Sequence, residues 1–411
     1  MTFLLRAFLP FALGYFISYA LRVVNAVIAP ELTAELGLDA EALGRLTAAY
    51  FFAFAAISIP LGGWLDRHRP EHVEACLLMV CALGCVLFAA VGMGAFAQDR
   101  TVMLTLARGL IGAGLASGLM AAFRAISYWQ APQNIAFFNG SMLAVGSVGA
   151  LTATVPTKWL LGFVHWSQLF VGLAGLAVTA ALWLGFFTPS RKPAHTSTAN
   201  STWAEVFAHP QYVLSLLFPS LTLAFALAFQ SLWATPWLID VAGVAKADIA
   251  APLAFVTWGM LSGNIFSAFL GKYLSTKNVS MTKVAGVYTL LTTLLIVGIW
   301  QLGKYAPRPW FFALGFAAMG TNILFVGFSQ YMPKEILGRA NAGFNTLIFG
   351  LSFCCQYGMG VVLNGFTTAE KGRYQVAGYD QAFTLVLCLI ACTAVLFVMA
   401  LQKYEHAHSH R

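Results

Sequence analysis

The stretch that decides the fold is GYFISYALRVVNAVIAP, from Gly14 to Pro30, which sets one arginine inside an apolar run. A helix rises about 1.5 Å per residue, so Arg22 lies about 12 Å from the helix end expected at Pro30. An arginine at a bilayer centre costs about 2.5 to 3.5 kcal/mol and usually faces a bundle interior or a watery cavity. Tyr19 and Asn25, three residues to either side, share its helix face. We interpret this polar stripe as the wall of a substrate cavity.

The composition is that of a membrane protein. Of the 411 residues, 59% are hydrophobic and 9% charged, whereas a soluble domain carries about 25% charged residues. Apolar runs of about eighteen or more residues recur along the chain between short polar breaks, which indicates many membrane-spanning helices. The net charge of +8 comes from basic residues scattered singly through the loops. This scatter favours a lipid bilayer as the partner and no nucleic acid.

The sequence predicts an all-α membrane protein with twelve transmembrane helices in two six-helix halves. The predicted spans are 8–30, 40–65, 74–97, 101–127, 134–160, 165–188, 210–240, 248–275, 281–303, 308–332, 338–366 and 379–402. The longest polar stretch, rich in Ser, Thr and Pro, separates the sixth span from the seventh, as a flexible linker would. We expect an N-terminal half over 1–188, a cytoplasmic linker over 189–208, and a C-terminal half over 209–411 that ends in a short cytoplasmic tail.

A short motif separates the second and third spans, where the sequence reads GGWLDRHR from Gly62 to Arg69. It resembles the G-x-x-x-D-R signature of the major facilitator superfamily, and it occupies that family's position. A weaker counterpart follows the eighth span. The two leading glycines are expected to allow close helix approach. The resemblance implies that Asp66 and Arg67 act as a gate latch; the open alternative is a positive-inside turn without a gating role.

The fourth span carries ARGLIGAG, Ala107–Gly114, which resembles the R-x-x-x-G motif in that helix of the same family. Arg108 would lie about 10 Å deep, close to the depth of Arg22. Spans one and four line the cavity of the N-terminal half in this family. The resemblance therefore implies that Arg22 and Arg108 hold a carboxylate or phosphate through forked hydrogen bonds. The alternatives for Arg108 are bonding to backbone carbonyls and snorkelling outward to the membrane surface.

The first helix also resembles that of the organophosphate:inorganic phosphate antiporters, which share the run G-Y-x-x-x-Y-x-x-R-x-x-x-A. Those antiporters use a second arginine from span seven. Here that span reads FQSLWATPW, Phe229–Trp237, and has no basic residue. A smaller or less charged organic anion is therefore expected instead of a phosphate monoester.

The second half offers uncharged candidates for contact with the solute. Gln230 and Trp233 lie in span seven, Asn322 in span ten, and Asn345 in span eleven, within a run that resembles bacterial members of the superfamily. Hydrogen bonding between helices is the alternative for each. None of the fifteen acidic residues lies in the middle of a predicted span. No titrating carboxylate is therefore expected in the membrane, and anion exchange, facilitated diffusion and proton coupling through the solute stay open.

We predict a secondary active transporter that moves a small organic anion by alternating access. The chain lacks the nucleotide loop G-x-x-x-x-G-K-[ST], so neither ATP driving nor an enzyme activity is expected. No cofactor or metal is expected. Both termini are expected in the cytoplasm because more basic residues fall on that side, with a monomer in the inner membrane of a bacterium. The alternatives are an exporter of amphipathic drugs or metabolites and a solute receptor that does not transport.

Overall fold

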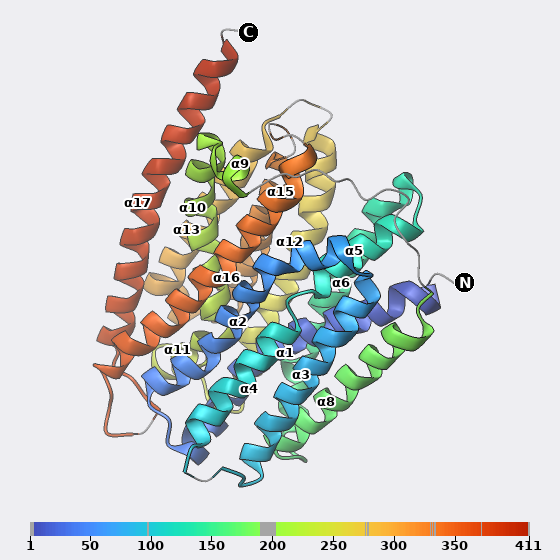
Figure 1. The fold of residues 1–411 in the computed structure, drawn as a ribbon. Helices are drawn as coiled ribbons and strands as arrows, with labels where there is room; N and C mark the ends of the chain where they lie inside the picture. The colour runs from blue at the N-terminus through green and yellow to red at the C-terminus, as the bar shows by residue number, and fades with distance from the viewer. Residues whose placement is uncertain are drawn as a thin grey trace.

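The protein is a bundle of long helices (Figure 1). The computed structural model describes residues 4–96, 98–189, 203–275, 277, 279–328, 330, 332, 334–370 and 372–409. Within these ranges, eleven helical segments are long and apolar enough to cross a membrane. An isolated antiparallel bridge joins Thr367 to Tyr374 in the loop before the last helix. The all-α membrane class is confirmed.

The helices of the first half follow the predicted spans in order. They are η1 Leu4–Phe8, α1 Leu9–Leu36, α2 Ala40–Arg67, α3 Pro70–Gly92, α4 Arg100–Gly114, α5 Gly118–Trp129, α6 Pro132–Thr152, α7 Val155–Leu160, α8 Trp166–Leu182 and η2 Trp183–Phe187. The predicted linker lies largely outside the described residues, but its last part forms the short helix α9, Trp203–Phe207.

The second half repeats this arrangement with more interruptions. Its elements are α10 Pro210–Ala228, η3 Phe229–Trp233, α11 Ala234–Asp240, α12 Ala250–Ser275, α13 Met281–Leu302, η4 Gly303–Tyr305, α14 Pro307–Gly320, η5 Thr321–Ile323, α15 Leu324–Phe328, α16 Lys334–Asn364 and α17 Val376–Ser409. The predicted tenth span therefore falls on three consecutive pieces, α14, η5 and α15. In Figure 1 the two halves lie on opposite sides, with α2 beside α16 where they meet.

The first span does not end at Pro30, as the sequence predicts, but continues to Leu36. A proline inside a helix has no N–H for the carbonyl four residues earlier. That carbonyl, on Ala26, instead accepts a hydrogen bond from Thr235 Oγ1 of α11. The helix ends at Gly37, whose left-handed backbone (φ 64°) lets its N–H bond to Thr33 O. A contact from the other half thus replaces the bond that the proline removes.

The predicted fourth span is broken at residues 115–117, between α4 and α5. Two glycines near the end of α4 bring its backbone against its neighbours. A Cβ on Gly112 would overlap the carbonyl of Tyr50 in α2, and one on Gly114 would overlap the backbone of Cys81 in α3. Close packing of this kind is the usual role of small residues between membrane helices. The glycines of the R-x-x-x-G region therefore fix α4 against α2 and α3.

The two ends of the bundle differ in how the halves meet. We name the end where α8 stops and α9 begins the linker end, and the opposite end, where α1 meets α2 and α16 meets α17, the far end. At the far end, a Cβ on Gly44 of α2 would lie 3.2 Å from Gly360 Cα of α16. One on Gly360 would lie 2.7 Å from Ala40 O. The Tyr357 hydroxyl also donates to Glu41 Oε1 over 3.1 Å, so the halves are joined side by side here.

At the linker end, the last turns of α2 do not make the close contact expected of them. A Cβ on Gly62 or Gly63 would have no atom within 4 Å. The expectation of close helix approach at this pair is therefore wrong for this conformation. The reason is that α2 and α16 meet through the Gly44 and Gly360 region, near the far end of both helices.

Candidate substrate site

Arg22 lies at the middle of α1 and is 7% exposed. Its guanidinium carbon is 4.4 Å from the ring centroid of Tyr19, 4.9 Å from that of Phe349 and 5.8 Å from that of Phe54. Cation–π contacts contribute about 0.5 to 2 kcal/mol, which offsets only part of the cost of a buried charge. Arg22 Nε makes no hydrogen bond, and no carboxylate in the described residues pairs with this guanidinium. Among the residues that the structure describes, this central positive charge has no counter-ion.

Arg108 of α4 lies against α1 but in a different setting. It is 1% exposed, and its Nη1 and Nη2 each donate to Leu21 O over 3.3 Å. With its amide oxygen turned toward the guanidinium, Asn25 accepts a further bond from Arg108 Nε over 3.2 Å. The ring of Tyr50 lies 5.2 Å from the guanidinium carbon. Arg108 therefore holds α4 against α1, as the backbone-bonding alternative describes, and Asn25 takes part in this contact.

Aromatic rings from both halves surround Arg22. Phe54 of α2 and Phe349 of α16 stack with centroids 3.9 Å apart and an interplanar angle of 18°. Tyr50 lies 6.0 Å from Phe54, and Tyr15 meets Tyr19 edge-on at 5.0 Å. The aromatic run from Tyr50 to Phe54 is visible in the sequence, but its spacing does not show which rings face inward. Phe349 carries no sequence signal of its own that points to Arg22.

The candidates of span seven make contacts between helices. Gln230 is 6% exposed in η3, and its Nε2 lies 3.1 Å from Met260 Sδ of α12. Trp233 is fully buried and donates from Nε1 to Gln356 O of α16 over 3.0 Å, with its ring beside Gly44. The donor of Trp233 is therefore used to join α16 to η3. Within the described ranges, the hydrogen-bond partner of Gln230 is this thioether, which is a weak acceptor.

The two asparagine candidates differ in their placement. Asn322 is half-buried in η5, and its Nδ2 lies 3.7 Å from Met319 Sδ in the preceding turn. Asn345 is half-buried in α16, one helical turn before Phe349, so the two share one helix face. Since Phe349 contacts Arg22, the structure brings Asn345 onto the face that leads toward Arg22. The contact of Asn322 stays within its own span.

The predicted latch lies at the end of α2. The side chain of Asp66 is outside the described residues, whereas Arg67 is the last residue of the helix and is exposed. The gating role of the pair stays a prediction.

A buried carboxyl group was not expected from the sequence. Glu74 lies in the second turn of α3 and is 0% exposed. Its burial in this helix contradicts the expectation that no titratable carboxylate lies in the membrane. It sits at the first position of the predicted third span, where a charged residue usually reaches the membrane surface. In the structure, α3 begins four residues earlier, which places Glu74 inside the bundle.

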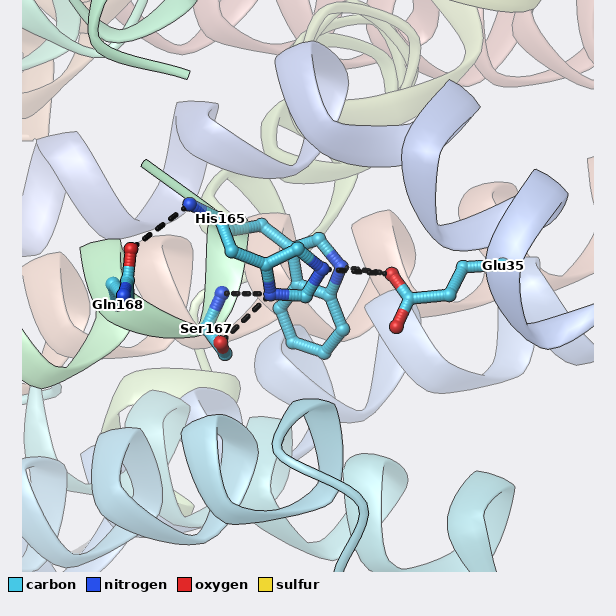
Figure 2. A network of polar contacts seen from close by, with 5 residues as sticks. Glu35, His165, Ser167 and Gln168 are labelled. Carbon is cyan, nitrogen blue, oxygen red and sulfur yellow. Dashed lines mark hydrogen bonds and ion pairs between the residues drawn. The ribbon is translucent and has the colours of Figure 1, made fainter. Parts of the chain in front are cut away.

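A second polar network lies at the far end of the first half (Figure 2). Glu35 Oε2 accepts from Trp166 Nε1 over 2.6 Å and lies 3.0 Å from His165 Nε2. The backbone N–H of His165 donates to Gln168 Oε1, and the backbone N–H of Ser167 donates to His165 Nδ1 over 3.3 Å, which together form a capping box at the start of α8. His165 Nδ1 also lies 2.7 Å from Ser167 Oγ. These groups satisfy one another. The network therefore anchors the end of α1 to α8 and is separate from the candidate site.

A bundle of membrane-crossing helices in two halves, with a buried arginine between them and one end closed, defines a polytopic carrier protein. The chain belongs to the Major Facilitator Superfamily, whose family model matches residues 11–355. It is a multi-pass membrane protein of a transporter family, which confirms the expectation of a transporter fold and of a chain that is not an enzyme.

Several transporters resemble the chain in sequence. It is 26% identical to "Probable sulfoacetate transporter SauU" of Cupriavidus necator, over 47% of this chain and 44% of that protein. The "Probable galactarate/D-glucarate transporter GudP" of Bacillus subtilis is 22% identical, over 95% of this chain and 91% of that protein. The "Hexuronate transporter" of Escherichia coli K12 is 26% identical over 44% of this chain. The chain thus spans less than half the length of the first and third of these relatives.

Solved structures share the fold over almost the whole chain. A bacterial homologue of the human lysosomal transporter Spinster, inward-facing and occupied, has a TM-score of 0.73 at 16% identity and covers 96% of each chain. A D-xylose-proton symporter has a TM-score of 0.69 at 14% identity and covers 96% of this chain. These likenesses establish the architecture.

Proposed function

We propose that this protein is a secondary active transporter that moves a small organic anion by alternating access, and that Arg22 binds the acidic group of the solute. The observation that carries the proposal is the buried guanidinium of Arg22, which has no carboxylate partner among the described residues and lies between aromatic rings of both halves. A carboxylate or sulfonate would pair with this charge and give Nε an acceptor. The bound anion would also touch both halves at once, as alternating access requires.

The names of the relatives support an organic acid as the solute. The three describe transporters of sulfoacetate, of galactarate or D-glucarate, and of hexuronate. Each solute is an anion at neutral pH with polar oxygens beyond one acidic group. We assign the binding of such oxygens to the uncharged side chains of Gln230 and Asn345. We assign contact with the solute to Tyr19 as well, and a positioning role to Arg108, Asn25 and Trp233, while Asn322 remains a candidate.

The arrangement of the halves supports alternating access. The far end is closed by Gly44 against Gly360 and by Thr235 bonded to Ala26 O. We propose that residues 1–188 and 209–411 move as the two halves, with Asp66 and Arg67 in the latch of the linker end. We also propose that the linker end faces the cytoplasm, because its loops hold more Lys and Arg than those of the far end.

The test is a thermal-shift screen of the purified protein with D-glucuronate, D-glucarate, sulfoacetate and a series of amphipathic drugs. A ligand at about 100 times its dissociation constant adds about 2.7 kcal/mol to the free energy of unfolding. We expect an organic acid to stabilise the wild type and the control Lys304→Gln, which removes an exposed cation, but not Arg22→Gln. The same acid should exchange across proteoliposome membranes.

Two results would count against the proposal. Stabilisation by organic acids that persists in Arg22→Gln would remove Arg22 from the site. Stabilisation by neutral or cationic amphipaths alone, independent of Arg22, would favour export of amphipathic compounds. Binding of the acid without exchange across the membrane would point to a receptor.

A further inference from the structure

Glu74 of α3 is a buried carboxyl group that the anion site does not use. Its Oε2 accepts a hydrogen bond from Ser117 Oγ, in the break between α4 and α5. Its Oε1 has no hydrogen-bond partner and faces α1, where a Cβ on Gly14 would lie 2.9 Å from it. The same oxygen would lie 3.6 Å from a Cβ on Gly118. The carboxyl group is thus enclosed by α1, α3 and α5, with one oxygen bonded and one free.

In the part of the chain that the structure describes, no cation neutralises this carboxyl group. Within the described residues, Glu74 forms no ion pair. Arg108 of α4 lies beside Gly84, because Ala107 O contacts that glycine, which is ten residues or about 15 Å along α3 from Glu74. Burying a carboxylate without a cation is costly, and a bound proton removes that cost by neutralising the charge.

The other ionisable groups of the surrounding elements do not supply a positive partner. From α1 the nearest is Tyr15, whose ring approaches Gly118 beside Glu74. Around it in α3 are the acids Glu71 and Cys81 and the exposed His72, which is two residues from Glu74 and therefore on another side of the helix, and α2 ends in the exposed Arg67. α5 carries Arg124, which lies six residues or about 9 Å along the helix from Gly118 and donates from Nε to the Tyr128 hydroxyl, and α8 and η2 contain no ionisable residue.

Short contacts connect Glu74 to the anion site. Tyr15, beside Glu74, meets Tyr19 at 5.0 Å, and the Tyr19 ring lies 4.4 Å from the Arg22 guanidinium. On the other side, Ser117 ends the segment that follows α4, the helix of Arg108. A change in the charge of Glu74 therefore acts on the packing of both helices that form the anion site.

We propose that Glu74 is the proton-binding site of this carrier, and that it takes up one proton for each anion transported. The inference rests on the proposed anion transport and names its coupling ion. The proton binds Oε1, which loses the negative charge, while Ser117 keeps its bond to Oε2. A monovalent anion on Arg22 and a proton on Glu74 then cross together without net charge.

The test uses wild-type protein in proteoliposomes that contain pyranine, with D-glucuronate as the probe. We expect an acidic exterior to drive accumulation and internal acidification. Glu74→Gln should lower gradient-driven accumulation at least tenfold and abolish acidification, while solute exchange at equal pH stays within about twofold. Glu74→Asp should retain the proton movement. Asp99→Asn, which changes an exposed carboxylate before α4, serves as the matched control.

Ser117→Ala gives a readout that a purely structural role would not move. Loss of its hydrogen bond destabilises the carboxylate form, so the pH midpoint of uptake should rise. Gradient-driven accumulation in Glu74→Gln equal to the wild type would overturn the inference. Exchange by the wild type without proton movement would also overturn it and leave the proposed function standing. Absence of exchange in the wild type would overturn both.

Discussion

Thr235 of α11 donates its hydroxyl hydrogen bond to the carbonyl of Ala26, the one carbonyl of α1 that Pro30 leaves without a helical N–H. The two residues belong to different halves, so a hydrogen bond from the other half replaces the one that is missing within α1. The bond exists only while the halves meet near the far end. Pro30 thus makes the closed far end more stable than it would be with an unbroken helix.

Replacement of Thr235 by valine should favour opening of the far end. The change leaves Ala26 O unpaired in the closed state, which costs about 1 to 3 kcal/mol, whereas water can satisfy it once the halves part. The readout is the rate at which maleimide reacts with Thr33→Cys, a site covered by the backbone of Gly372. The rate should rise in Thr235→Val and stay unchanged in Thr235→Ser, which keeps the hydroxyl. Equal rates in all three proteins would contradict this assignment.

A methyl group at Gly360 should also weaken the closed far end. The new Cβ would lie 2.7 Å from Ala40 O, and overpacking of this kind costs about 1 to 3 kcal/mol. Gly358, two residues earlier in α16, has no atom within 4 Å of an added Cβ. Gly358→Ala should therefore leave the midpoint of thermal unfolding unchanged or raise it, because alanine favours helix by about 1 kcal/mol. A similar loss in both variants would refute the contact as the cause.

Removal of the charge of Arg22 should stabilise the empty protein. Arg22→Met deletes a buried cation without a counter-ion and loses cation–π contacts, for a net gain of about 1 kcal/mol in the free energy of unfolding. Differential scanning fluorimetry without ligand would show the gain. The same variant should show no stabilisation by D-glucuronate. A lower midpoint than the wild type would mean that Arg22 has a partner in the empty protein.

Substitution by lysine should have different effects on stability and on ligand binding at Arg22 and at Arg108. Arg108→Lys keeps the charge but cannot bond Leu21 O and Asn25 together, so we expect a loss of about 1 to 3 kcal/mol in stability. Arg22→Lys should leave the unfolding midpoint within error and weaken the binding of organic acids. The paired midpoints and ligand shifts test this difference. A large loss of stability in Arg22→Lys alone would reverse the assignment.

The proposed orientation can be tested by labelling from each side of the membrane. Four native cysteines are exposed, namely Cys76, Cys354, Cys388 and Cys392, and are first replaced by serine. Gly62→Cys at the linker end should then react with an impermeant maleimide in inside-out vesicles only. Phe163→Cys, at an exposed far-end site, should react in right-side-out vesicles only. The reverse pattern would place the termini outside the cell.

Span positions follow closely from hydropathy, because the apolar length needed to cross a membrane is a local property. The predicted range 40–65 corresponds to Ala40–Arg67, and 281–303 to Met281–Leu302. The helix end expected at Pro30 was wrong, because α1 continues past this proline. The carbonyl of Ala26, which the proline leaves without a partner in the helix, accepts a bond from Thr235, 209 residues away. No local pattern contains that information.

The candidate site, too, is predictable from the sequence only in part. The burial of Arg22 and Arg108 is predictable, because a charge inside an apolar run must find a polar setting. Their different contacts depend on the rotation of α4 against α1, which decides whether Leu21 O and Asn25 meet a guanidinium. Glu74 does not stand out in the sequence, because its place at the edge of a predicted span resembles that of any interfacial carboxylate.

The π-helical turn η3, Phe229–Trp233, has a consequence for how this chain should be aligned with its relatives. A π-turn closes its hydrogen bonds over five residues instead of four, so this span contains one residue more than a regular α-helix of the same rise. A relative with a regular helix here would be one residue shorter. The single-residue gap belongs within 229–233 and not in the flanking loops, since any other placement shifts Gln230 out of register with its true counterpart.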